Sequence, residues 1–508
     1  MPVVAGTAAR SARGFCRDTD GIVLPYVTIM LLVIVGVGVL ALDGARYTSL
    51  QTQLQKGADA LALAGAAELD RMPASSQGAG DDSISRATAA INNQSFVVNS
   101  TILTAANVSV SSIRFFSALP ASDATYPIPA SFVTADPTKA RFVEVTVQAV
   151  SINTILPASF FGGTTTVSTT GQAVAGMDIV ACKTIPLFMC NPFEQTGDSY
   201  ATATQRLRNA SVNTSVLYRF NPTANNGNGT WGPGNFGYLS PTTGAFVDDK
   251  CFPQAGGGIA QAMASSNPNV CYTLNGVTLQ PGNAQAARDG LNTRFGLTPN
   301  NFGSTCGSSY GPDVNVRKGF AAQGNGKNAN WCSATPDASS TNTWAPGNNA
   351  KSLPLDNSFT GNLGNGQWDC ATYWSTNHPN TAAPTAWGCT STSTVPRYTV
   401  YNYEITQNLL SDHPNASQET GAPQCNAASA SSGRRILYVS IINCLSSPVS
   451  IQSNASGVPV AGIGKFFLTT PYPDNSWQNT TTNSPYGEYL GLAGPTNGTV
   501  YDQVQLYR

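Results

Sequence analysis

The sequence IVLPYVTIMLLVIVGVGVLAL, residues 22–42, decides the fold, because it carries no charge over its whole length. About twenty apolar residues in a helix cross the hydrocarbon core of a bilayer, which is roughly 30 Å thick. No proline follows Pro25 until Pro73, and residues 43–72 are rich in Ala, Leu and Gln, which favour helix formation. The sequence therefore predicts one transmembrane helix over 21–42 that continues beyond the membrane over 43–72.

One apolar stripe follows this extension, because Leu50, Leu54, Ala58, Leu61 and Ala64 recur every three or four residues. Two interpretations are open. The stripe packs beneath the protein's own first sheet, or it contacts a partner helix, as small-residue faces do in membrane bundles. We favour a partner helix, since the stripe is longer than one short helix and a small sheet would cover.

Residues on both sides of the membrane boundary carry a family resemblance. Gly21 precedes the apolar span, DGARY (43–47) follows it, and residues 54–64 read LQKGADALALA. This pattern resembles the N-terminal segment of the TadE/TadG-like proteins of the bacterial tight-adherence (Tad, or Flp) pilus machinery. The resemblance implies a membrane protein that acts with other Tad/Flp pilus-assembly proteins or pilins. Further segments resemble the C-terminal half of longer TadG-related proteins: PGNFG (233–237), NTRF (292–295), GNGQWD (364–369), RRILYVSIINC (434–444) and KFFLTTP (465–471).

The composition excludes a nucleic-acid-binding protein. The net charge is −1 and only 10% of the residues are charged, so no basic patch is available for phosphates. The polar residues are mostly Ser, Thr, Asn and Gln, as in exported proteins rich in loops and strands. At 41% hydrophobic residues the chain can still form a core, which argues against general disorder.

The cysteines indicate an oxidising compartment. Cys16 precedes the apolar span, and the other ten of the 11 cysteines follow it. An even number in an exported region predicts up to five disulfides, with a small loop between Cys182 and Cys190 as one natural pairing. No CxxC occurs and only two His are present, so we expect no metal site and no cofactor. The disulfide candidates are Cys182, Cys190, Cys251, Cys271, Cys306, Cys332, Cys370, Cys389, Cys425 and Cys444.

The charges that flank the span predict its orientation. Arg10, Arg13 and Arg17 precede it, whereas Arg46 is the only basic residue close behind it. An excess of Lys and Arg on one side places that side in the cytoplasm. We therefore expect a single-pass protein of the bacterial inner membrane with a cytoplasmic N-terminus and a periplasmic C-terminal domain.

Prepilin-like segments are cleaved after a glycine, and many carry glutamate at the fifth residue of the mature chain. Here Gly21 is followed by IVLPY, residues 22–26, so that glutamate is missing. We favour an uncleaved anchor, and cleavage after Gly21 stays open as the alternative.

The overall prediction is an α+β protein of five parts. They are a cytoplasmic N-terminus (1–20), the transmembrane helix (21–42), its extension (43–72), a TadE/G-like helix-on-sheet module (73–180) and a loop-heavy, cysteine-rich domain (181–508). Asp82 or Ser83 is expected to cap a short helix that ends near Asn92. Alternating apolar residues predict strands over 142–147, 397–405, 434–442 and 464–469.

Three motifs resemble metal or catalytic sites. Asp81, Ser83 and Ser85 match the start of the von Willebrand A metal site, which many TadG relatives carry, but no buried strand precedes them, so helix capping is favoured. Residues 307–311, GSSYG, match the nucleophile-elbow pattern without its strand. The loop containing Asp356 and the segment 364–369 could suit calcium, yet Asn and Gly turns explain them better.

His378 and His413 each precede a proline in a polar stretch, which predicts solvent-exposed turns. An exported hydrolase is therefore the least favoured function. The sequence predicts a non-enzymatic, membrane-anchored component of Tad/Flp pilus assembly that acts through protein contacts in the periplasm. The alternative is a minor pseudopilin or tip-like adhesin that is incorporated in the fibre.

Overall fold

The chain folds into two compact units, residues 1–177 with 504–508, and residues 178–503. Predictions about residues 1–22, the turn at 71–79, Cys332 and His413 fall outside the described residues. The computed structural model describes residues 23–70, 80–95, 97–99, 105–120, 122, 125–155, 165–212, 214–220, 231–240, 251–252, 257–266, 268, 271–274, 276–280, 285–298, 302, 304–318, 352–412, 420–447, 449–452, 454–472, 485–494 and 500–507.

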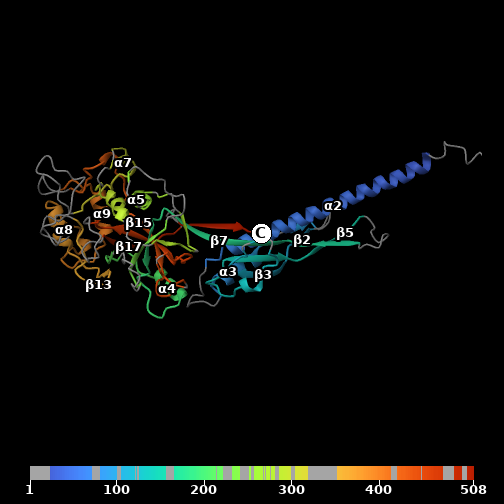
Figure 1. The fold of residues 1–508 in the computed structure, drawn as a ribbon, viewed down its shortest axis with the longest axis horizontal. Helices are drawn as coiled ribbons and strands as arrows, with labels where there is room; N and C mark the ends of the chain where they lie inside the picture. The colour runs from blue at the N-terminus through green and yellow to red at the C-terminus, as the bar shows by residue number, and fades with distance from the viewer. Residues whose placement is uncertain are drawn as a thin grey trace, which may run out of the picture. The chain divides into compact units, whose positions relative to one another are not determined.

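A single helix, α2 (Val23–Ala66), forms both the apolar span and its extension (Figure 1). Its 44 residues make a rod of roughly 66 Å. The predicted continuity between the two segments is confirmed, and the helix ends six residues before the expected limit at residue 72.

The first unit packs helices on a sheet in which β3, β4 and β7 are antiparallel neighbours and β18 also pairs with β7. Residues 178–182 of β7 and 500–503 of β18 belong to the second unit, where residues 180–182 pair with β11. Phe142–Val147 is the central strand, as the alternation predicted, and its residues pair with both neighbours. The core between helices and sheet contains Ala58, Ile91, Val143 and Ala175. The elements are α3 (Ser83–Asn93), β1 (Val97–Asn99), β2 (Ala105–Asn107), β3 (Val110–Phe116), η2 (Ala130–Phe132), β4 (Phe142–Val147), β5 (Val150–Asn153), β6 (Thr166–Thr169), β7 (Gln172–Cys182) and β18 (Val500–Leu506).

Helix α3 begins where the capping residues predicted. The Asp82 carboxylate accepts hydrogen bonds from the Ser85 backbone N–H (3.0 Å) and the Ser85 hydroxyl (2.7 Å). Ser83 is buried, and its hydroxyl donates to the Pro137 carbonyl (2.9 Å). These partners occupy Asp82 and the two serines of the Asp-x-Ser-x-Ser motif as a helix cap does.

The second unit is built on a nine-stranded sheet in the order β12-β10-β8-β15-β16-β17-β9-β14-β13. Successive side chains point to opposite faces of the sheet. Phe466 therefore packs with Leu437 in one apolar cluster, whereas Phe467 packs with residues of helices α8 and α9 in another. The elements are β8 (Leu187–Cys190), α4 (Tyr200–Arg208), β9 (Leu217–Arg219), β10 (Phe236–Leu239), α5 (Gly257–Ala264), β11 (Cys271–Thr273), β12 (Leu279–Gln280), α6 (Gln285–Thr293), α7 (Ser304–Ser309), β13 (Phe359–Thr360), β14 (Leu363–Gly364), α8 (Cys370–Asn377), η5 (Thr385–Trp387), α9 (Arg397–Thr406), η6 (Ala427–Ser429), β15 (Ile436–Ile442), β16 (Gly462–Leu468) and β17 (Tyr486–Leu492).

The strand predicted over 397–405 is wrong, because these residues form helix α9. Arg397, Val400, Tyr401 and Glu404 are its buried residues, and their spacing of three, one and three marks one helix face. The Glu488 carboxylate accepts from the first two backbone N–H groups of the helix (both 2.8 Å). The buried Glu488, on strand β17, thus caps this helix. No pattern within residues 397–405 indicates this contact.

Disulfides join distant parts of the second unit. The predicted Cys182–Cys190 loop is wrong, because Cys182 lies opposite Cys271 on paired strands β7 and β11. Cys190 ends β8, and its partner follows the neighbouring strand β15. Cys425 is also disulfide-bonded. The described pairs are Cys182–Cys271, Cys190–Cys444, Cys251–Cys306 and Cys370–Cys389.

Candidate functional site: the apolar helix and its attached sheet

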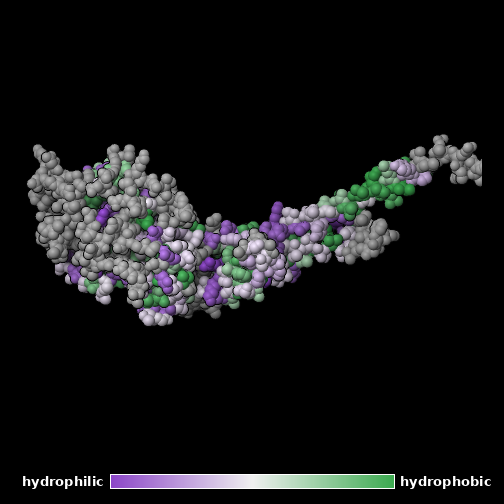
Figure 2. Space-filling model, viewed as in Figure 1, coloured by the Kyte–Doolittle hydropathy of each residue, from purple (hydrophilic) through white to green (hydrophobic). Residues whose placement is uncertain are grey.

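The N-terminal half of α2 exposes its apolar side chains. Leu32 is 73% exposed, and none of the most apolar window of the helix is buried; its mean hydropathy is 2.5. Figure 2 shows this stretch in green at the end of the helix. Among the described residues it is the one helix long and apolar enough to cross a membrane.

Asp43 and Arg46 form polar contacts with a neighbouring hairpin where the apolar span ends. The Asp43 carboxylate accepts from the Ile155 backbone N–H, with both oxygens at 2.9 Å. One turn later, Arg46 lies 3.5 Å from Asp43 and donates to the Asn153 carbonyl (3.3 Å). Two residues of the DGARY motif therefore attach the β5–β6 hairpin to the helix.

Gln55 forms a second attachment between helix and sheet. Its side-chain amide donates to the Gln172 carbonyl (2.7 Å) and accepts from the Gln172 N–H (3.3 Å). It thereby pairs with the first residue of β7 as a neighbouring strand would. A side chain at Gly171 would overlap the Leu54 backbone, so glycine permits this close approach.

The predicted partner-helix face lies largely inside the protein. Leu50, Leu54, Ala58 and Leu61 are buried in the core of the first unit, whereas Ala64 is partly buried. A helix partner would have to displace that core to use the four buried side chains. The partner helix itself stays a prediction; Gly36 and Gly38, in the apolar half of α2, have open space around them.

The second unit contains a buried polar network around His378. The prediction of a solvent-exposed turn is wrong for this residue, which is buried at the end of α8. Its Nε2 lies 2.9 Å from a Glu404 oxygen, and its Nδ1 lies 3.1 Å from Asp412. Burial would raise the pKa of Glu404, but the hydrogen bond with His378 and the charge of Arg317 bring it below its ordinary value.

A second buried cluster centres on Arg397. Its guanidinium is 2.7 Å from Asp356, whose other oxygen accepts from the Gly366 N–H (2.7 Å). Asp369 caps α8 by accepting from Thr372. Asp356 and Asp369, the two acids that could have suited calcium, thus already have partners within the protein. Such partners are expected of acids in a structural turn. Within the described part of the chain, no group of three or more Cys, His, Asp or Glu is arranged to hold a metal.

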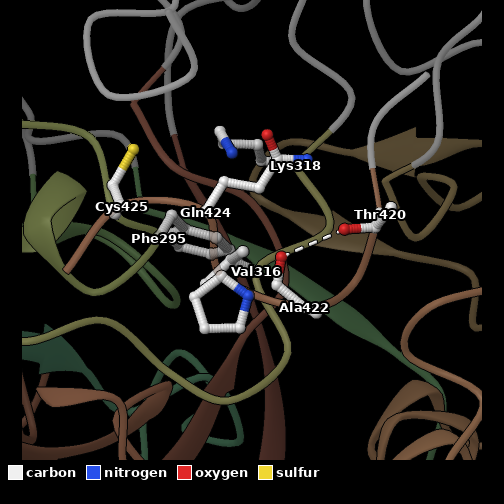
Figure 3. A pocket seen from close by; sticks show the side chains of 9 residues that line it. Phe295, Val316, Lys318, Thr420, Ala422, Gln424 and Cys425 are labelled. Carbon is white, nitrogen blue, oxygen red and sulfur yellow. Dashed lines mark hydrogen bonds between the residues drawn. The ribbon is translucent and has the colours of Figure 1, made fainter. Parts of the chain in front are cut away.

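The nucleophile-elbow candidate, residues 307–311, does not have the strand–turn–helix context of such a site among the residues described around it. The GSSYG segment begins inside α7, and Cys306 just before it is bonded to Cys251. A small pocket lies nearby, lined by Phe295, Val316, Lys318 and Gln424 among others. Figure 3 shows Phe295 and Val316 close together, with Lys318 and Gln424 above them in this view. Its described lining contains one ammonium group and no carboxylate or imidazole.

Burial raises the pKa of Glu488 to about 7. Because its pKa is raised, the Glu488 carboxyl keeps its proton in the folded state at pH values where the unfolded chain, with a pKa near 4.5, has released it. The contribution of Glu488 to stability is therefore present at low pH and is lost as pH rises through 7. We expect Glu488 to contribute a fall of roughly 3 kcal/mol in the free energy of unfolding between pH 4.5 and 7, so that the wild type loses more stability over this range than Glu488→Gln. Denaturant melts at a series of pH values measure the slope. An unchanged slope in the variant would exclude Glu488 as its source.

Residues 21–68 match the Flp pilus-assembly TadE/G-like family. The N-terminal segment of the chain is therefore TadE/G-like, and the resemblance predicted for this segment is confirmed. The matched region ends beside the last residue of α2, so it spans the helix and both of its attachments to the sheet. No curated protein matches the chain, and no solved structure does.

Proposed function

We propose that this chain with a TadE/G-like N-terminal segment is a membrane-anchored, non-enzymatic component of Tad/Flp pilus assembly. The apolar half of α2 spans the inner membrane with the N-terminus in the cytoplasm. The remainder of the chain lies in the periplasm, where it contacts other pilus-assembly proteins or pilins.

One observation carries the proposal. The family match covers the helix that can span a membrane together with Asp43, Arg46 and Gln55, which attach the first unit to that helix. The matched segment therefore contains both an apolar span and the residues that attach a folded unit to it. A shared anchoring device supports a shared place at the assembly machinery.

The second unit supports a structural role. Some of its buried charges pair with one another, as Arg397 does with Asp356, and two disulfides join segments that are far apart in the sequence. Such a unit is suited to presenting a fixed surface, and disulfides persist in an oxidising compartment such as the periplasm.

The decisive measurement is the intact mass of the protein from purified membranes and from sheared surface fibres, with and without reductant. We expect the full-length chain in the membrane fraction alone, lighter before reduction by two hydrogens for each disulfide. A chain that begins at Ile22 in the fibre fraction would overturn the anchor and establish the alternative, a minor pseudopilin or tip-like adhesin.

A further inference from the structure

The β5–β6 hairpin follows α2 toward its apolar half. The hairpin begins near Gln172, which is hydrogen-bonded to Gln55. Ile155, the last described residue after β5, is hydrogen-bonded to Asp43. These two helix positions are twelve residues apart, or roughly 18 Å along the axis. Figure 1 shows β5 leaving the sheet in the direction of the N-terminal half of α2.

The described end of the hairpin is level with the end of the apolar span. Asp43 directly follows the uncharged residues 22–42, and its carboxylate contacts the Ile155 backbone at 2.9 Å. Ile155 nevertheless exposes 49% of its surface, and Val167 on the opposite strand exposes 38%. No Asp, Glu, Lys or Arg occurs between Glu144 and Asp178. An exposed isoleucine on an uncharged ribbon therefore lies where the proposed membrane ends.

We propose that Ile155, next to strand β5 of the hairpin, makes a second membrane contact in the headgroup region of the bilayer that α2 spans. This inference rests on the anchor of the proposed function. Exposed apolar side chains gain from burial at the headgroup boundary. A two-stranded ribbon has unpaired backbone groups at its edges, which cannot enter the hydrocarbon core. The contact is consequently shallow.

The contact would give the anchor a defined orientation. A lone helix can rotate about its axis and tilt in the membrane, whereas a helix with a hairpin fixed to one side presents that side to the interface. The Asp43 and Arg46 contacts hold the hairpin to α2, so lipid contact at Ile155 sets the rotation of the first unit.

Depth-dependent quenching tests the contact in the full chain. Cys16→Ser protein in lipid nanodiscs receives one further cysteine, at Ile155→Cys or Val167→Cys, which is labelled with an environment-sensitive fluorophore under non-reducing conditions. The unsubstituted Cys16→Ser protein measures background labelling. Lipids with a nitroxide near the headgroup or deep in the acyl chain then report depth. We expect strong quenching at 155 by the headgroup nitroxide, less by the deep one, and weaker quenching at 167.

Val133→Cys is the matched control. Val133 is 45% exposed and bridges to Phe116, at the end of β3 away from the hairpin. We expect no quenching there. Leu32→Cys reports the anchor itself and should be quenched most by the deep nitroxide. Quenching at 155 no greater than at 133, with 32 quenched, would overturn the hairpin contact and leave the anchor standing. Absence of quenching at 32 would overturn both.

Discussion

Replacing Leu54 by aspartate is expected to unfold the first unit of the purified protein. Leu54 is completely buried in the core between α2 and the sheet, beside Gly171. A carboxylate at this position would lose its hydration without gaining a partner, which costs about 4 kcal/mol or more. A loss of this size removes a large part of the stability of a typical domain.

Gln51→Asp is the matched control, because Gln51 lies on the same helix and is exposed. We expect thermal or denaturant melts to separate the two variants clearly, with Gln51→Asp close to wild type. If Leu54→Asp were as stable as Gln51→Asp but failed to support pilus assembly, the stripe would be a partner surface. That result would restore the partner-helix interpretation and contradict the packing described for α2.

Replacing Glu404 by alanine is expected to lower the free energy of unfolding by about 3–5 kcal/mol, because it leaves buried charge without a partner. Arg317 would lose its carboxylate, His378 would keep only its contact with Asp412, and Tyr373 would lose the acceptor of its 2.6 Å hydrogen bond. The lowered pKa of Glu404 adds a pH dependence with a definite sign. Its contribution is present above the ordinary value of 4.5 and is lost as pH falls below it, so the wild type and the variant should converge at low pH.

Arg206→Gln supplies the comparison, because Arg206 pairs with Asp198 at 3.0 Å while its own side chain is 42% exposed. Partly exposed pairs contribute about 0–1 kcal/mol. Denaturant titrations of the three proteins at neutral and acidic pH measure both effects. Equal stability of the two variants would contradict the interpretation that the hydrogen bonds and ion pairs of Glu404 stabilise the folded protein.

Local periodicity was sufficient to predict the elements that use neighbouring residues. The apolar span and its extension form one helix, and Asp82 caps α3. The strands predicted over 142–147, 434–442 and 464–469 are found as Phe142–Val147, Ile436–Ile442 and Gly462–Leu468. In each case the side chains that decide the conformation lie within a few residues of it. The anchoring half of the candidate site was predictable for the same reason.

Non-local contacts account for the errors. Residues 397–405 alternate like a strand but form a helix whose first N–H groups are satisfied by Glu488, about ninety residues later along the chain. His378 is buried because Glu404 and Asp412 bind both ring nitrogens. The attachment of Asp43 to Ile155 depends on residues separated by 112 positions. No window of sequence contains both partners of these contacts.

The strand β18 makes the order of synthesis matter for the first unit. Residues 504–508 belong to the unit that begins with α2, and the Tyr507 N–H donates to the Val174 carbonyl. A chain emerging from a translocation channel would place its anchor helix early, yet it would leave that edge of β7 unpaired until the whole second unit had followed. Because open edges invite pairing with other chains, we expect export, if the protein is exported as proposed, to keep this edge of β7 away from other chains until residues 504–508 have followed.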